Sequence, residues 1–274
     1  ADGSSQSIVT DDDWVSSDHS PVLANDFWDG ERYDARIAQE IEGWNDDGYD
    51  VADWSPVSVA TYQGELRSST RATARIADEF DRPAVSQYTY NDAETLSPAA
   101  AGNDFGTVVE HAASVDRAVT VKAGDKLIVD FGQNATGAIQ LTVNGAVGTA
   151  VKVRHAEMLN DGRKNPTVAA GGSDGPAGSL YLTALKGLKD AYDTYVLSDE
   201  GVQTWTPSYT FHGFRYAEIS ADATIQVRSV VAKTFTSVGE ETGTFTTNDA
   251  DINKLVSNTK WSQVSNYLSI PTDC

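Results

Sequence analysis

Carboxylates are the residues of this chain with the clearest chemical potential, because it holds 40 Asp and Glu but only 4 His and 1 Cys. Two carboxyl groups can hydrolyse a glycosidic bond when one donates a proton to the leaving oxygen and the other activates a water molecule. Asp130 and Glu157 end strand-like segments and could face a cleft as such a pair. Acids in such places also cap turns or pair with a nearby arginine, here Arg154. The sequence leaves both interpretations open.

Other catalytic chemistries have little support in the sequence. The four histidines are scattered, and no His-x-x-x-His pair suited to a metal occurs among them. No phosphate-binding glycine loop of the P-loop type is present. Cys274 is the single cysteine, so the chain forms no internal disulfide and builds no cysteine-based zinc site.

The charge of the chain is strongly negative and uneven. Its formal net charge is −20, and residues 1–54 hold fifteen acids against two bases. This balance argues against a nucleic-acid partner, which requires a basic face. Clustered acids either solvate a surface or bind a hard cation such as Ca²⁺, although Asp11-Asp12-Asp13 lacks the spacing of a calcium loop. No apolar run long enough to cross a membrane and no signal peptide occurs, which leaves cytoplasmic and secreted locations equally open.

The elements that must position these side chains are mostly strands. Ile139, Leu141 and Val143 alternate with polar residues, and Asn144-Gly145 follows them as a strong hairpin signal. The turn at residues 122–125 separates two further strand-like segments in the same way. Short strands with Gly, Asn and Asp turns predict an antiparallel β-sandwich, and no strand–helix alternation favours a parallel sheet.

One long helix is expected at the end of the chain, over Asp249–Ser269, with Asn248 as its cap. It carries two apolar stripes that are rotated from each other, so we expect it to have partners on two sides. A lone helix after an all-β region predicts the first helix of a helical domain that lies beyond this sequence. Its exposed apolar face could also join two copies of the chain into a homo-oligomer. The stripes are Ile252, Leu255 and Val256, and Trp261, Val264 and Leu268.

Both ends of the sequence suggest a piece of a longer protein. The chain opens on Ala1 without an initiator Met, just before a strand-like segment. It closes on Cys274 without a polar tail, although natural termini are usually loose surface segments.

Several motifs, in this order, resemble those of the bacterial α-L-rhamnosidases of glycoside hydrolase family 78. Each is weak alone, but the resemblance extends over residues 7–274. The motifs are Asp29-Gly30-Glu31-Arg32-Tyr33-Asp34-Ala35-Arg36, Asp130-Phe131-Gly132-Gln133-Asn134, Arg154-His155-Ala156-Glu157, Phe211-His212-Gly213-Phe214-Arg215-Tyr216, Trp261-Ser262-Gln263-Val264-Ser265-Asn266 and Ile270-Pro271-Thr272-Asp273-Cys274.

The resemblance implies three domains and an all-β fold of jelly-roll-type antiparallel sandwiches, followed by one C-terminal helix. Residues 1–83 resemble the remainder of a carbohydrate-binding-like β domain, and residues 84–237 resemble the β-sandwich before the catalytic domain. Residues 238–274 resemble a linker and the first helix of an (α/α)6 catalytic barrel.

The resemblance also implies an activity, the release of terminal α-L-rhamnose from rhamnosides with inversion. The catalytic acid and base of the family lie beyond Cys274, so none is expected within the chain, which is expected to be inactive alone. Of the sugar-pocket acids, Asp273 matches a position that contacts rhamnose. No cofactor is required, and the partners implied are rhamnose-containing glycosides or polysaccharides.

A second site implied by the resemblance involves calcium. Some family members bind rhamnose through Ca²⁺ with an Asp-Asn pair before an Asp, and here Ala24 replaces the first Asp. Asn25 and Asp26 are then the possible calcium ligands, and Asn25, Asp26 and Glu31 the possible sugar contacts.

The remaining motif residues have a more probable structural role than a catalytic one. The motifs around Gln133, His155 and His212 are expected to be structural, with His212 packing and hydrogen-bonding within the fold. Phe211, Phe214 and Tyr216 are expected to pack in the core or at an interface. A different class of function is also compatible with the sequence, namely a stand-alone carbohydrate-binding or scaffold protein without catalysis.

Overall fold

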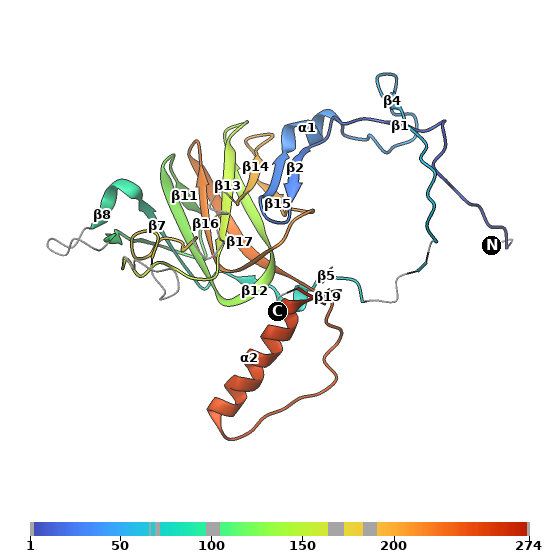
Figure 1. The fold of residues 1–274 in the computed structure, drawn as a ribbon. Coiled ribbons are helices and arrows are strands. Elements are labelled where there is room, and N and C mark those ends of the chain that lie inside the picture. Colours follow the sequence, from blue (N-terminus) through green and yellow to red (C-terminus); the bar gives the residue numbers. More distant parts are fainter. Residues whose placement is uncertain are drawn as a thin grey trace.

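One folded-over sheet forms most of the protein. The computed structural model describes residues 3–65, 67–68, 72–96, 105–163, 173–182 and 191–272. Thirteen strands within these ranges join a single sheet. Its strands stack as two layers, while the segment with β1 and β4 lies away from them (Figure 1). The predicted all-β sandwich, followed by a single long helix, is confirmed.

The strand β12 (Asp125–Gly145) belongs to both layers and explains the folding over. Its first half pairs with β7 and β16, and its second half pairs with β17 and β15. Between the halves the register shifts from Asp130 to Ala135, and Gly132 takes a φ of 70° that favours glycine. The Asp-Phe-Gly-Gln-Asn motif is therefore the bend of the sandwich.

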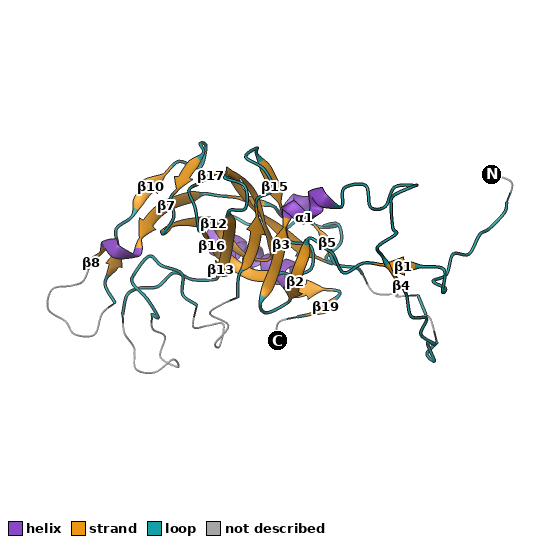
Figure 2. Ribbon diagram, turned by 90° about the horizontal axis from the view of Figure 1, so that it is seen from above, coloured by secondary structure: helices purple, strands orange, loops and turns teal. Residues whose placement is uncertain are grey.

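The first layer is antiparallel except at one place, where β3 runs parallel to β14. Figure 2 shows β2 and β3 side by side in this layer. Through β3, the amino-terminal β2–β3 hairpin is the edge of this layer. The strands follow the order β10 (His111–Ala113), β7 (Ser86–Asn91), β12, β16 (His212–Ala221), β13 (Ala150–Ala156), β14 (Asp193–Val196), β3 (Gly30–Asp34) and β2 (Val22–Asp26).

The second layer is built on β17 (Ile225–Thr236), which pairs with the second half of β12. Its other strands are β11 (Val119–Val121), β5 (Arg75–Ile76), β6 (Arg82–Pro83) and β15 (Gln203–Trp205). Three small pairs lie outside the sheet: β1 (Val15–Ser16) with β4 (Ser55–Pro56), β8 (Thr95–Leu96) with β9 (Thr107–Val108), and β18 (Tyr267–Leu268) with β19 (Ile270–Pro271). The short helical turns are α1 (Ala35–Glu40), η1 (Asp78–Phe80) and η2 (Asp92–Glu94).

The main core fills the space between the two layers. Alternate residues of β12 supply it from both halves, because successive side chains of a strand point to opposite faces. Phe131 and Phe214 meet edge to face within it, with ring centroids 5.7 Å apart. A smaller cluster on the outer face of the first layer contains Tyr90, Val108, Ile128, Ala156 and Leu180.

The strands predicted in the middle of the chain are present, whereas the strand-like segment at residues 7–10 forms no strand. The hairpins predicted between the middle strands are wrong. Asn144 and Gly145 lie inside β12, paired with β17, and β13 pairs instead with β14 and β16 in the first layer. The turn at residues 122–125 likewise joins β11, which pairs with β17, to the start of β12 in the other layer. Both connections cross between layers, because the hydrophobic face of each strand can be buried from either side of the core.

The long helix α2 (Ala250–Asn266) lies near the predicted position with different ends. Asp249, rather than Asn248, is its cap, since its Oδ1 accepts hydrogen bonds from the N–H groups of Asp251 and Ile252. The helix ends at Asn266 because β18 and β19 form a hairpin, with Ser269 at a φ of 68° between them. Within the described residues, no helix is long and apolar enough to cross a membrane.

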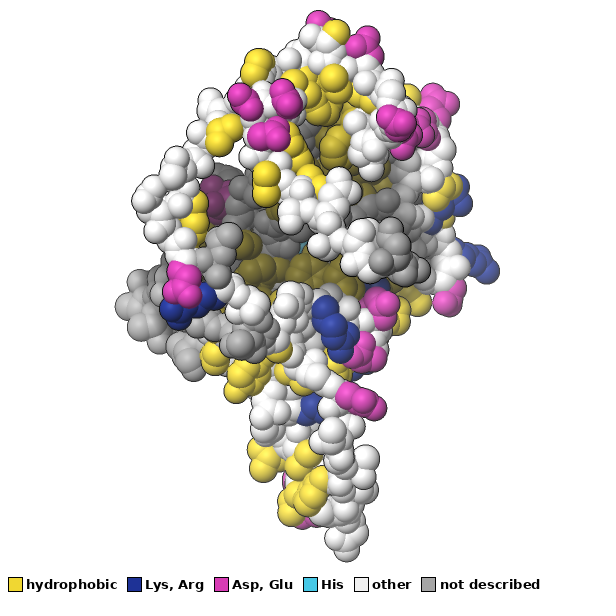
Figure 3. Space-filling model, turned by 90° about the vertical axis from the view of Figure 1, so that its right-hand side faces the viewer, with side chains coloured by type: hydrophobic (Ala, Val, Ile, Leu, Met, Phe, Trp, Pro, Cys, Tyr) yellow, Lys and Arg dark blue, Asp and Glu magenta, His cyan; other side chains and the backbone are white. Residues whose placement is uncertain are grey.

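Of the two apolar stripes of α2, only the second is covered. Val264 is buried, and Trp261 packs against Phe80 with ring centroids 5.6 Å apart. Leu255 of the first stripe is 63% exposed. Figure 3 shows hydrophobic side chains at the surface of the projection that α2 forms with the preceding segment. The helix therefore has a partner on one side.

The sheet also connects the predicted domains. β2 and β3 from residues 1–83 join the edge of the first layer, and β5 and β6 pair with β17. The boundaries at 83 and 237 remain predictions, and the structure adds that strands on both sides of residue 83 share one sheet.

Candidate functional site

Asp130 is held in an ion pair rather than in a catalytic pair. Its two carboxylate oxygens accept hydrogen bonds of 2.8 Å from Nε and Nη2 of Arg215, and Oδ1 also accepts the N–H of Gly132. Burial alone would raise the pKa of Asp130, but the Arg215 side chain and the Gly132 amide together hold that pKa below its ordinary value. Asp130 is therefore ionised at neutral pH and cannot act as a proton donor.

Glu157 lies just after β13, where its Oε1 accepts a 2.8 Å hydrogen bond from Nδ2 of Asn134. This bond links the end of β13 to the bend of β12. The arginine that pairs with Asp130 is Arg215 and not Arg154. The two predicted acids thus brace the bend, which is the structural alternative left open by the sequence.

The hairpin residues Asn25, Asp26 and Glu31 do not gather around one point. Asn25 lies opposite Glu31 in the register, whereas Asp26 is the next residue and points to the other face. Asn25 and Asp26 are exposed, and Glu31 is fully buried. Ca²⁺ requires six to eight oxygen ligands, so these three side chains do not fit a single calcium ion as placed.

Asp26 and Asp273 complete the predicted site residues. Oδ1 of Asp26 accepts the N–H groups of Trp28 and Asp29, at 2.7 and 3.2 Å, and closes the hairpin turn. Asp273 lies outside the described residues.

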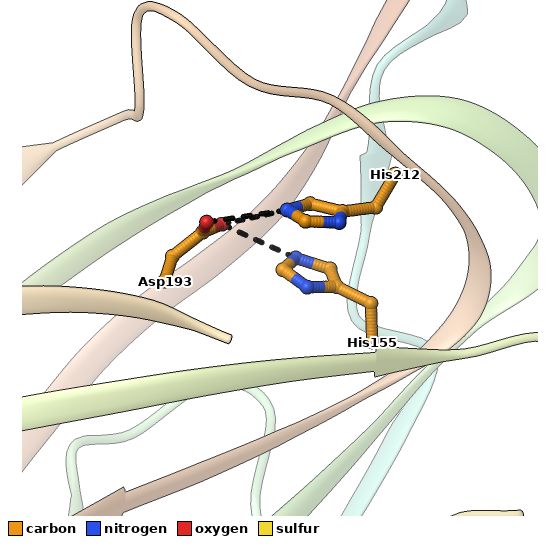
Figure 4. Close-up of side chains that lie close together, drawn as sticks. All are labelled: His155, Asp193 and His212. Carbon is orange, nitrogen blue, oxygen red and sulfur yellow. Dashed lines mark hydrogen bonds and ion pairs between the residues drawn. The ribbon is translucent and has the colours of Figure 1, made fainter. Parts of the chain in front are cut away.

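A buried cluster that the sequence analysis did not assemble lies where four strands of the first layer meet. The rings of His155 and His212 stack with centroids 4.0 Å apart and planes 14° apart. Both rings direct Nε2 toward the carboxylate of Asp193 (Figure 4). Nε2 of His212 lies 3.1 and 3.2 Å from the two oxygens, and Nε2 of His155 lies 3.8 Å from Oδ2.

Glu31 connects this cluster to the hairpin. Its N–H donates a 2.9 Å hydrogen bond to Oδ1 of Asp193. Its own Oε2 accepts the backbone N–H groups of Ser208 and Tyr209 at 2.9 and 2.8 Å. Gly30 permits this close approach, because a Cβ there would lie 2.6 Å from the carbonyl oxygen of Tyr192. We call Glu31, His155, Asp193 and His212 the hairpin cluster.

Burial controls the charge state of the hairpin cluster. Burial, together with the neighbouring His212, holds the pKa of His155 well below its ordinary value of 6.5, so its ring is neutral at physiological pH. Burial raises the pKa of Glu31, the two backbone N–H groups oppose that rise, and the charge of Asp193 adds to it. Within the described part of the chain, neither ring nitrogen of His155 has a hydrogen-bond partner, and neither does Oε1 of Glu31.

The composition of this cluster suggests a metal site, but its ring geometry does not. The donor atoms of His155, Asp193 and His212 lie within 4.8 Å of one another. Two stacked, nearly parallel rings direct their nitrogen lone pairs side by side, whereas a tetrahedral metal at about 2.0–2.1 Å requires them to converge. Asp193 also uses both oxygens in hydrogen bonds already. The arrangement is a closed polar joint between strands.

Glu218 is a second buried acid that the sequence analysis missed. Burial raises its pKa, against the opposing charges of Lys126 and Arg154 and the hydrogen bond from Tyr90. A raised carboxyl pKa is typical of a general acid. Glu218 is however covered by the outer cluster around Tyr90, which favours a packing role over a catalytic one.

The signals for these residues were weak in the sequence. His155 and His212 belong to two of the motifs, which predict structural roles for both and a hydrogen bond for His212, as His212 forms with Asp193. No local pattern distinguishes Asp193 and Glu218 from the other 38 of the 40 acids, since burial depends on contacts between residues far apart in the chain.

Three family models match this chain in order. Residues 1–78 match the α-L-rhamnosidase N-terminal domain, and residues 121–237 match the bacterial α-L-rhamnosidase concanavalin-like domain. Residues 240–274 match the bacterial α-L-rhamnosidase six-hairpin glycosidase domain.

Curated relatives agree with these matches. An α-L-rhamnosidase of Streptomyces avermitilis is 32% identical over the whole chain, which covers 22% of that protein. One from Formosa agariphila is 28% identical, again over the whole chain and 24% of the relative. The chain thus spans about a quarter of the length of the curated relatives that it matches.

Solved structures of α-L-rhamnosidases are also similar to this chain. The Streptomyces avermitilis α-L-rhamnosidase complexed with L-rhamnose has a TM-score of 0.71 at 30% identity, with 100% of this chain and 22% of that chain covered. The α-L-rhamnosidase of Dictyoglumus thermophilum has a TM-score of 0.70 at 27% identity, with 97% of this chain and 24% of that chain covered. Three models of α-L-rhamnosidase domains match in order and together cover most of the sequence, so the chain is similar over most of its length to part of the bacterial α-L-rhamnosidases.

Proposed function

We propose that this chain supplies accessory β domains and the first helix of the catalytic domain to an α-L-rhamnosidase, and that it does not hydrolyse glycosides alone. The full enzyme would release terminal α-L-rhamnose from rhamnosides with inversion. The observation that carries the proposal is the extent of the glycosidase-domain match, which is confined to residues 240–274. The chain also covers only 22–25% of its curated relatives.

The chemistry of the reaction supports the proposal that this chain does not hydrolyse glycosides alone. Inversion needs one protonated and one ionised carboxyl on opposite faces of the sugar ring. Asp130 is ionised by its contact with Arg215, and Glu157 bonds to Asn134. Asp273 is our proposal for a sugar contact, and a single acid cannot serve both catalytic roles.

The exposed stripe of α2 has a natural occupant under this proposal. Leu255 and Val256, with Phe245 and Phe80, line a groove between α2 and the segment before it. We propose that further helices of the six-hairpin domain cover this groove in the full enzyme. In the 274-residue chain, a second copy is the alternative occupant, and the oligomeric state at increasing concentration distinguishes them.

Sugar binding by the hairpin is a separate proposal. Phe27, Trp28 and Tyr209 are exposed aromatics around the turn that Asp26 closes, and aromatic faces suit the apolar face of a sugar ring. Because the predicted calcium ligands do not converge, we assign no calcium step to them. Calorimetric titration with L-rhamnose tests whether the hairpin binds the sugar, and the same titration with CaCl₂ tests whether calcium affects that binding. The Asp26→Asn variant shows whether the carboxylate of Asp26 contributes to the affinity.

Hydrolysis of a chromogenic α-L-rhamnoside tests the main proposal. The 274-residue chain should release no chromophore above background, and a chain continued through the six-hairpin domain should turn over. A stand-alone binding protein would be inactive in both forms.

A further inference from the structure

The β2–β3 hairpin is attached to the sandwich by strand pairing, polar contacts and aromatic packing. β3 pairs with β14 over three residue pairs, beginning at Thr194 and Arg32. At the turn, Oγ1 of Thr210 donates to the carbonyl oxygen of Asp26 at 3.0 Å. The N–H of Tyr192 donates to the carbonyl oxygen of Asp29 at 3.3 Å, and further polar contacts run through Glu31 and Asp193. Aromatic packing adds to these bonds, since the ring centroid of Tyr33 lies 5.9 Å from that of Tyr195. One member of the hairpin cluster, Glu31, belongs to β3, and its bond to Asp193 would have to break for the hairpin to detach.

Within the described residues, the titratable groups placed at this cluster come from four strands. Glu31 and Tyr33 come from β3, Asp193 from β14, His155 from β13 and His212 from β16. Behind His155 lies an apolar wall, since the ring of Phe214 stands 4.9 Å away at a steep angle. The cluster thus contains two carboxyls and two imidazoles, and the side chain of His155 is 4% exposed.

While the β2–β3 hairpin is attached to the sandwich, protonation of His155 is unfavourable. The added charge would sit 4.0 Å from the centre of the His212 ring. The nearest carboxylate oxygen, Oδ2 of Asp193, lies 3.8 Å from Nε2 and is already bound by His212. A buried charge without a hydrogen-bonded partner is strongly unfavourable. In the detached state, water could solvate the same charge.

We propose that the hairpin cluster is an acid-sensitive latch, which holds the β2–β3 hairpin on the sandwich while His155 is neutral and releases it when His155 gains a proton. This inference concerns the chain itself and does not depend on the activity of the full enzyme.

The sign of the pH effect follows from the two states. The pKa of His155 is well below 6.5 when the hairpin is attached and returns toward 6.5 when it is detached. The detached state therefore binds the extra proton as the pH falls below about 6.5, and detachment becomes more favourable. Glu31 acts in the opposite direction, because burial raises its pKa in the attached state and acid then favours attachment.

Hydrogen exchange of the backbone amides in β3 and β14 measures the latch directly. After correction for the intrinsic exchange rate, lowering the pH from about 7.5 to about 5.0 should raise the opening equilibrium by at most about 30-fold, and by less where Glu31 offsets it. Amides at the centre of β12 report global unfolding and should change much less.

His155→Phe should remove this response, because a phenyl ring fits between His212 and Phe214 and cannot be protonated. Glu31→Gln should make the wild-type response steeper, because it removes the opposing carboxyl. His111→Gln is the matched control, since His111 is exposed on β10 and pairs with Glu94. Its response should equal that of the wild type.

Two results would overturn the proposal. One is a wild-type opening equilibrium that changes less than about twofold over this range. The other is a response that persists unchanged in His155→Phe. If that variant does not fold, NMR titration of the imidazole signals in the wild type shows whether protonation of His155 accompanies the opening of β3. Protonation of His155 near pH 6.5 without faster exchange in β3 would refute the latch.

Discussion

The backbone N–H of Glu31 donates a 2.9 Å hydrogen bond to Oδ1 of Asp193, across 162 positions of sequence. Asp193 is 1% exposed and also contacts the stacked pair His155 and His212. A single side chain thus joins the amino-terminal hairpin to the edge of the sandwich. The stability of this joint can be tested apart from any enzymatic activity.

Replacing Asp193 by Ala should lower the free energy of unfolding by about 3 kcal/mol, because it leaves a buried N–H of Glu31 and Nε2 of His212 without partners. Urea unfolding measures the loss. Asp12→Ala is the control at an exposed position and should change stability by less than about 0.5 kcal/mol. Equal effects of the two substitutions would show that the joint contributes nothing.

Replacing Gly30 by Ala should cost more than about 2 kcal/mol. Its φ is 89°, and the added Cβ would lie 2.6 Å from the carbonyl oxygen of Tyr192 and 2.7 Å from Oδ1 of Asp193. Gly48→Ala provides the matched control, since Gly48 has a φ of 85° and no heavy atom within 4 Å of a built Cβ. That variant should lose only about 1 kcal/mol, from backbone strain. Thermal unfolding of both variants measures the two effects, because Gly30→Ala introduces both steric overlap and backbone strain, whereas Gly48→Ala introduces backbone strain alone.

Asp130→Asn should reveal a pH-dependent contribution to stability. The folded pKa of Asp130 is below its unfolded value of about 3.9, so the contribution is present above that value and disappears as the pH falls through the folded pKa. Because the Arg215 side chain is 40% exposed, we expect about 1 kcal/mol at neutral pH.

Urea unfolding at about pH 7 and about pH 2.5 tests this sign. The stability deficit of Asp130→Asn should be smaller at the lower pH, because Asp130 of the wild type loses charge as the pH falls toward its folded pKa. Arg215→Lys keeps the charge but loses the two-point hydrogen bond, and should show a smaller deficit with the same pH dependence. A deficit of equal size at both pH values contradicts the assignment.

Two substitutions on α2 should differ sharply in the 274-residue chain. Val264 is 1% exposed against the sandwich, so Val264→Ala should cost about 2 kcal/mol. Leu255 is 63% exposed, so Leu255→Ala should cost less than about 0.5 kcal/mol. In a protein that includes the remaining helices, Leu255→Ala should become destabilising. A large effect of Leu255→Ala in the short chain at low concentration would mean that its apolar stripe is already covered.

The sequence was sufficient for the class of fold and for most strands, because alternation at Ile139, Leu141 and Val143 reports burial on one face. It was insufficient for the pairing of those strands. Asn144-Gly145 has the residues typical of a hairpin turn, yet both residues belong to the end of β12 and pair with β17. Local turn preference is small compared with the burial gained when the two halves of β12 enclose the core.

The candidate site shows the same division between local and long-range information. The observed cap of α2 is Asp249, one residue after the predicted Asn248, because either side chain can accept hydrogen bonds from the first free N–H groups of the helix. The sequence predicts structural roles for His155 and His212, but the stacking of their rings beside Asp193 depends on β14 and β16 both pairing with β13. No local pattern marks Asp193 for that position.

The central claim is that this chain positions a catalytic domain and lacks a catalytic pair of its own. Its most direct test is the steady-state hydrolysis of a chromogenic α-L-rhamnoside by four proteins: the 274-residue chain, the chain continued through the six-hairpin domain, and that longer protein with Asp130→Asn or with Glu157→Gln. We predict no turnover by the short chain and turnover by the longer one, with kcat reduced less than about tenfold by either substitution, because both acids brace the bend of β12. Turnover by the short chain that disappears with Asp130→Asn or Glu157→Gln would contradict the account and place the active site in the sandwich.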